Sequence, residues 1–167
     1  MEMRRIYIWL IAIVICMLSL LGFVAMNFSI SAQPTPGRFE TWLANRVKSW
    51  AIRQASARAH QPLPPAHIAA AVSRGRGLFN MECAFCHGHN GQKTSAIGYS
   101  MYPRVLTLDS PQVQNLSNRE MYWVIENGIR LSGMPGFAKI NNQSEIWELV
   151  LYAHSLGHAN QSMPIKK

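Results

Sequence analysis

The chain is organised around Cys83-Ala84-Phe85-Cys86-His87. This stretch has the C-x-x-C-H pattern, which is typical of covalent attachment of a c-type haem. Two thiols three residues apart on one helical turn can reach the two vinyl groups of a porphyrin, and the histidine that follows can present its imidazole to the iron. The motif occurs once, so it predicts one covalent haem c, bound by Cys83 and Cys86 with His87 as an iron ligand.

Two other sites share the cysteine spacing. A thioredoxin-like redox pair is expected between a strand and a helix, and a zinc site needs two further ligands at short spacing. Neither context surrounds these cysteines, and a site that uses thiols alone has no need of His87. The third cysteine, Cys16, lies in an apolar run. No disulfide is therefore expected in the soluble part once both motif sulfurs carry haem.

The residues before the motif extend the pattern. Gly75 and Phe79 precede Cys83 on the same helical face, and Gly88 follows the histidine. This arrangement resembles the start of class I cytochromes c, although the glycine also fits an ordinary helix crossing. The resemblance implies an all-α haem domain in which the first helix crosses the last at Gly75, with Tyr152 as the aromatic residue at that crossing.

A second segment that resembles this family is Gly128-Ile129-Arg130-Leu131-Ser132-Gly133-Met134-Pro135-Gly136-Phe137. It is similar to the ligand loop of bacterial class I cytochromes c, where a methionine followed by proline closes the site. The resemblance implies that Met134 is the second axial ligand, held in an extended stretch by Gly133 and Pro135. Apolar residues expected around the haem are Phe79, Phe85, Leu106, Ile125, Phe137 and Leu149.

Pro103 and Arg104 are further candidates for contact with the haem. In the family, a proline about this far after the histidine offers its carbonyl to the second ring nitrogen of that histidine. The resemblance implies the same role for Pro103, and Arg104 could pair with a haem propionate. A simple turn explains Pro103 equally well, so both interpretations remain open.

The N-terminal part of the chain predicts a membrane anchor. Residues 6–26 contain no charged side chain and follow Arg4 and Arg5. A helix of this length spans about 30 Å, enough to cross a bilayer. The basic pair should stay in the cytoplasm. With a single membrane crossing, the haem domain is then expected on the periplasmic side of a bacterial inner membrane. Haem attachment after export, as in the family that the chain resembles, implies the same side. A cleaved signal peptide is the alternative, with a weak cleavage match at Ile30-Ser31-Ala32.

These segments give an all-α chain in four parts. Residues 1–28 are the transmembrane anchor, 29–63 a linker and an amphipathic Trp/Arg helix, 64–160 the class I cytochrome c haem domain and 161–167 a C-terminal tail. Helical periodicity, caps and breakers predict helices at 38–59, 65–82, 117–128 and 142–157. A loop at 89–114 is expected to wrap around the haem.

The helix at 38–59 has an unusual apolar stripe. At helical spacing it carries Phe39, Trp42, Leu43, Val47 and Trp50, with Arg46 and Arg53 at the edge. This helix could pack on the haem domain or lie at the membrane interface, where tryptophan and arginine are both favourable. It could instead dock the protein into a larger membrane complex. The sequence does not decide between these interpretations.

The charge distribution narrows the class of partner. The net charge is +8, but residues 60–167 hold nine basic against six acidic side chains, so the haem domain is only mildly basic. No recognised nucleic-acid-binding fold is present, so no nucleic acid is expected as a partner. An acidic protein or anionic lipid is favoured.

Two strong axial ligands leave no open site on the iron, so no small-molecule substrate and no catalytic residue are expected. The main hypothesis is one-electron transfer on the periplasmic side, as a subunit or tethered partner of a respiratory or related membrane complex. The expected partners are therefore other redox proteins. One alternative is a free-standing tethered electron carrier. A second is a haem-based sensor in which a ligand displaces Met134.

Overall fold

The computed structural model describes residues 2–27, 31 and 35–161. Residues 28–30 and 32–34, where the predicted anchor ends and the predicted 29–63 segment begins, lie outside the described residues, and so do two of the three residues of the weak cleavage match and residues 162–167 of the predicted tail. The chain divides into two units, Met1–Ser31 and Ala32–Lys167. The described residues form helices without any strand, and they include one isolated β-bridge between Ile129 and Met134. The predicted all-α fold is therefore confirmed.

The first unit is the helix α1, Glu2–Asn27. It is long and apolar enough to cross a membrane, with a mean hydropathy of 2.8 over its most apolar window. None of its side chains is buried within the protein. This is the expected state of a helix whose apolar surface is covered by lipid rather than by a protein core.

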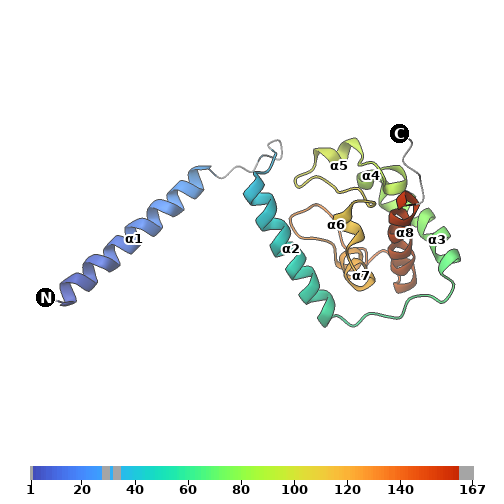
Figure 1. Cartoon of the computed structure of the whole chain (residues 1–167), viewed down its shortest axis with the longest axis horizontal. Coiled ribbons are helices and arrows are strands. Elements are labelled where there is room, and N and C mark those ends of the chain that lie inside the picture. Colours follow the sequence, from blue (N-terminus) through green and yellow to red (C-terminus); the bar gives the residue numbers. More distant parts are fainter. Residues whose placement is uncertain (1, 28–30, 32–34, 162–167) are drawn as a thin grey trace. The chain divides into compact units, whose positions relative to one another are not determined.

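The core of the second unit is the crossing of α3, Ile68–Glu82, with α8, Gln143–Gln161 (Figure 1). Gly75 makes the close approach possible, because a Cβ there would collide with the backbone carbonyl of Glu148. One turn further along, the Phe79 and Tyr152 rings pack with centroids 5.2 Å apart. The crossing predicted from Gly75 and Tyr152 is confirmed.

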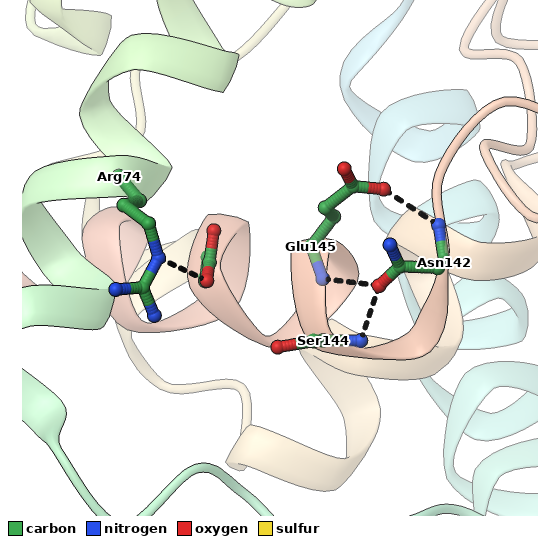
Figure 2. A network of polar contacts seen from close by, with 5 residues as sticks. Arg74, Asn142, Ser144 and Glu145 are labelled. Carbon is green, nitrogen blue, oxygen red and sulfur yellow. Dashed lines mark hydrogen bonds and ion pairs between the residues drawn. The ribbon is translucent and has the colours of Figure 1, made fainter.

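Polar groups fix both the crossing and the start of α8 (Figure 2). The Arg74 Nε donates a hydrogen bond to Glu148 Oε1 at 2.6 Å, and the Glu148 side chain is only 7% exposed. At the helix start, Asn142 Oδ1 accepts the backbone N–H groups of Ser144 and Glu145, and the Glu145 carboxylate accepts that of Asn142 at 2.8 Å. These reciprocal bonds satisfy N–H groups that have no partner within the helix.

The helix α7, Asn118–Asn127, packs beside α8. Its start is a capping box between Ser117 and Glu120, and Gly128 ends it with a φ of +72°, as the sequence predicts. Its inward side chains join a single apolar cluster. The buried members of that cluster are Phe79, Met121, Tyr122, Ile125, Phe137, Ile146, Trp147, Leu149, Val150, Tyr152, Ala153 and Leu156.

Two predicted helix boundaries are wrong. The helix α3 begins at Ile68 rather than at Pro65, and α8 continues to Gln161 rather than ending at Gly157. The missing side chain of Gly157 makes room for Gln114, with which a Cβ would collide. Gln114 Nε2 in turn donates to the carbonyl oxygens of Leu108 and Ala153, at 2.6 and 2.9 Å. This glycine therefore permits a close approach and does not stop the helix.

The predicted wrapping loop contains short helices. They are the 3₁₀ turn η1, His89–Gly91; α5, Ala96–Ser100; and α6, Pro111–Gln114, and they follow the short helix α4, Ala84–His87, which contains most of the motif. Backbone bonds close the segment on itself, from Val105 N–H to the Gly98 carbonyl at 3.1 Å and from Leu108 N–H to the Gly91 carbonyl at 2.8 Å. The segment is thus ordered by its own turns around the C-x-x-C-H motif.

The helix α2, Arg38–Arg58, belongs to the second unit and packs on α7. Its buried residues are Ile52 and Ser56. Arg119 of α7 donates to the carbonyl oxygens of Ser56, Ala57 and Ala59 at 2.7, 3.1 and 2.7 Å. A guanidinium at this end satisfies carbonyls that lack partners within the helix.

Candidate functional site

The C-x-x-C-H motif lies where α3 ends and α4 begins. Cys83 caps both helices, since its N–H donates to the Phe79 carbonyl at 2.9 Å and its own carbonyl accepts the His87 N–H at 2.9 Å. Cys83 and Cys86 are half-buried and not joined by a disulfide. One helical turn therefore brings both thiols and the imidazole together at the edge of the α3–α8 pair.

The chemistry of Cys83 disfavours a redox pair. Burial, and then the charges of Glu82 and Cys86, raise the pKa of the Cys83 thiol to about 12. A thioredoxin-like nucleophile instead has a depressed thiol pKa. Within the described part of the chain, moreover, no three His, Cys, Asp or Glu side chains come together as a metal site. The zinc interpretation therefore lacks its additional ligands there.

The orientation of His87 suits a metal ligand. Its Nδ1 lies 3.2 Å from the carbonyl oxygen of Leu106. Because a carbonyl can only accept, Nδ1 carries the proton, and Nε2 of the neutral ring keeps its lone pair for a metal. Burial lowers the pKa of His87, although the bond to Leu106 opposes this effect. The neutral imidazole is the form that binds iron.

The expected role of Pro103 is not what the structure shows. The carbonyl that meets the His87 ring belongs to Leu106, while Pro103 lies in an exposed bend after α5. The backbone bonds of Val105 and Leu108 fix the segment between them alongside the motif, and this register presents Leu106. Any residue can supply a carbonyl, so no side-chain signal in the sequence distinguishes the two positions.

Arg104 is exposed, and its guanidinium carbon lies 4.1 Å from the centroid of the Tyr99 ring. Such stacking is a cation–π contact. It holds the guanidinium against the Tyr99 ring, and contact with a propionate stays a prediction.

Met134 lies on an extended stretch between α7 and α8. Positive φ angles of 64° and 75° at Leu131 and Gly133 turn the chain back on itself. The Ile129 N–H then donates to the Met134 carbonyl at 3.2 Å, and the Met134 N–H donates to Ser132 Oγ at 3.3 Å. The Met134 side chain is half-buried and packs against the same apolar cluster that Cys83 borders.

The apolar residues expected around the site divide into two groups. Four belong to the buried cluster, namely Phe79, Ile125, Phe137 and Leu149. Phe85 and Leu106 are 68% and 39% exposed, so the structure does not place them in that cluster. Sequence reasoning also missed Ser95, whose hydroxyl donates to the carbonyls of Phe85 and Cys86 at 2.7 and 3.1 Å and so holds the end of α4.

The donor set fits a c-type haem. Cys83 and Met134 border one apolar cluster, the His87 ring lies beside Phe79 of that cluster, and both motif cysteines are outside any disulfide. Thioether bonds require unpaired thiols, and a low-spin haem iron accepts a histidine nitrogen and a methionine sulfur. The residues present therefore match this group in both number and chemistry.

Residues 70–152 match the family model described as cytochrome C oxidase, cbb3-type, subunit III. This chain belongs to the membrane-anchored monohaem cytochromes c. The cbb3-type cytochrome c oxidase subunit CcoP of Azospirillum brasilense is 30% identical to it over 89 residues, which are 53% of this chain and 30% of that relative. This cytochrome thus spans about a third of the relative's length. It carries covalently bound haem c.

Proposed function

We propose that this cytochrome transfers single electrons on the periplasmic side of a bacterial inner membrane, as a subunit or tethered partner of a membrane oxidase complex. The similarity to subunit CcoP of a cbb3-type oxidase supports the complex. The apolar α1, with Arg4 and Arg5 at its start, supports the orientation, because basic residues favour the cytoplasmic side.

We assign Cys83 and Cys86 to the thioether bonds, and His87 and Met134 to the axial positions. When bound, the haem supplies a one-electron ferric/ferrous couple. The observation that carries the assignment is the bond from His87 Nδ1 to the Leu106 carbonyl. That bond holds the His87 ring and would leave Nε2 free to bind the iron when the haem is attached.

The other residues set how the couple behaves. A thioether from Met134 favours ferrous iron and raises the reduction potential relative to a second histidine. The buried cluster beside Met134 excludes water, which disfavours the additional charge of the ferric state. We further propose the exposed Arg104 as a partner for a propionate. If His87 and Met134 hold both axial positions, the iron would have no open site and electrons would pass without a bound substrate.

The test of the ligand set is an optical spectrum of the oxidised holoprotein. We expect the near-infrared sulfur-to-iron band of methionine ligation, and Met134→Ala should abolish it. Met81→Ala is the matched control, because Met81 is 75% exposed on α3, and it should keep the band. A wild-type protein without the band would refute Met134 as the ligand.

The test of the complex is mild detergent extraction, followed by a native gel stained for haem. Haem that migrates with a large assembly indicates a relay subunit. Haem that migrates as a small species indicates a tethered carrier. A sensor is distinguished separately, because carbon monoxide should bind the reduced native protein only if Met134 is displaced.

A further inference from the structure

The helix α2 has an apolar face that the haem domain does not cover. Five large side chains on it are between 45% and 72% exposed, and we call them the outer face of α2: Phe39, Trp42, Leu43, Val47 and Trp50. Their spacing of three or four residues places them along one side of the helix. Exposed apolar stripes of this kind mark interaction surfaces.

The outer face points away from the haem domain. The side of α2 that packs on α7 carries the buried Ile52 and Ser56. At 100° per residue, the centre of the outer face lies about 140° around the helix from that side. The haem domain therefore cannot cover it without releasing α2.

Both ends of α2 are fixed to the haem domain. Near its start, the Tyr102 hydroxyl donates to the Glu40 carboxylate. At its end, Arg119 donates to the carbonyls of Ser56, Ala57 and Ala59. The helix is thus bonded to the haem domain at both ends, so whatever binds the outer face of α2 would set the orientation of the haem domain.

The charge on α2 indicates an anionic surface. The helix carries five basic side chains, Arg38, Arg46, Lys48, Arg53 and Arg58. Its one acidic side chain, Glu40, is bonded to Tyr102. Arg46 and Arg53 line a shallow groove beside Trp42, and the Arg46 guanidinium carbon lies 5.9 Å from the Trp42 ring centroid. Indole rings with guanidinium groups beside them suit the phosphate layer of a bilayer.

The covalent tether keeps α2 close to a membrane. The helix α1 ends at Asn27 and α2 begins at Arg38. The ten residues between them span at most about 35 Å, even when fully extended. The start of α2 therefore cannot move far from the headgroup layer that α1 leaves.

We propose that the outer face of α2 binds the surface of a bilayer rich in anionic phospholipid. Trp42 and Trp50 enter the interface, and Arg46 and Arg53 bind headgroup phosphates. The excess of cations favours this occupant over an apolar protein surface. The consequence is that lipid composition sets the orientation of the haem domain.

The test uses the full-length holoprotein with Cys16→Ser, in nanodiscs of phosphatidylcholine alone or with 30% phosphatidylglycerol. A cysteine at Val47→Cys is alkylated with a membrane-impermeant maleimide. We expect at least fivefold slower alkylation in the anionic nanodiscs. The matched control is Ala51→Cys, since Ala51 is exposed but lies off the outer face, and its rate ratio should stay near one.

Charge removal gives the second measurement. Each basic residue near an anionic surface is worth about fivefold in binding, so Arg46→Gln with Arg53→Gln should abolish the protection at Val47→Cys. Equal alkylation in both kinds of nanodisc would overturn the proposal. Slow alkylation of Val47→Cys in native membranes, combined with fast alkylation in both kinds of nanodisc, would also overturn the proposal. A protein partner, and not lipid, would then cover the outer face of α2.

Discussion

At the scale of single residues, the Arg74–Glu148 pair makes the sharpest prediction. The Glu148 side chain is 7% exposed and that of Arg74 is 57% exposed. Arg74→Ala leaves a nearly buried carboxylate without its cation, and we expect the free energy of unfolding to fall by about 1–3 kcal/mol. This loss is smaller than for a fully buried pair, because solvent screens the charge of the exposed Arg74. Urea unfolding of the holoprotein measures it.

The control for this pair is Arg76→Ala, an exposed position on the same helix, which should change the free energy by less than about 0.5 kcal/mol. Adding Glu148→Gln to Arg74→Ala should restore part of the loss, because the buried charge is removed. A double variant no more stable than Arg74→Ala would show that the loss does not come from an unpaired carboxylate.

Residue chemistry also explains which parts of the site the sequence could predict. Cys83, Cys86, His87 and Met134 can be proposed from the sequence because the required chemistry depends on their particular side chains. Pro103 is only one candidate acceptor for His87 in the sequence, and the observed acceptor is Leu106, because a backbone carbonyl carries no residue-specific signal. The long-range register of the backbone decides which carbonyl meets the His87 ring, and that register cannot be predicted from a single sequence.

At the scale of the elements, two glycines of α3 should respond in opposite directions to the same change. A Cβ at Gly75 would collide with the Glu148 carbonyl, whereas one at Gly77 would meet no atom within 4 Å. Gly77→Ala should stabilise the protein by about 0.5–1 kcal/mol through helix propensity. Gly75→Ala should destabilise it by more than about 1 kcal/mol, since α3 must move from α8. Thermal unfolding of both holoproteins measures the contrast.

If Gly75→Ala were as stable as Gly77→Ala, the close crossing of α3 and α8 would be refuted. The resemblance to class I cytochromes c implies this crossing, with Tyr152 as the aromatic partner of the glycine. At Gly157 the same residue type predicts the end of the helix, and that prediction is wrong, because α8 continues to Gln161. The difference lies in a distant partner, since Gln114 occupies the space beside Gly157, and nothing near Gly157 in the sequence points to it.

At the scale of the whole molecule, an α1 that spans a membrane would put its first residues and the haem domain on opposite sides of that membrane. The predicted orientation rests on Arg4 and Arg5, and cysteine labelling in intact cells tests it in the Cys16→Ser background. Leu131→Cys, at an 89% exposed position, should react with an impermeant maleimide added outside. Met3→Cys should react only after the cells are opened.

Replacing Arg4 and Arg5 with glutamine should weaken this asymmetry, because the basic pair is the cytoplasmic signal. Labelling of Met3→Cys in intact cells with the arginines present would contradict the proposed orientation. An outward haem domain has a further consequence for α2. The basic side chains of α2 would then face the periplasmic leaflet of the membrane. The anionic lipid that binds the outer face of α2 must therefore be present in that leaflet. Labelling at Leu131→Cys and protection at Val47→Cys should then occur in the same molecules.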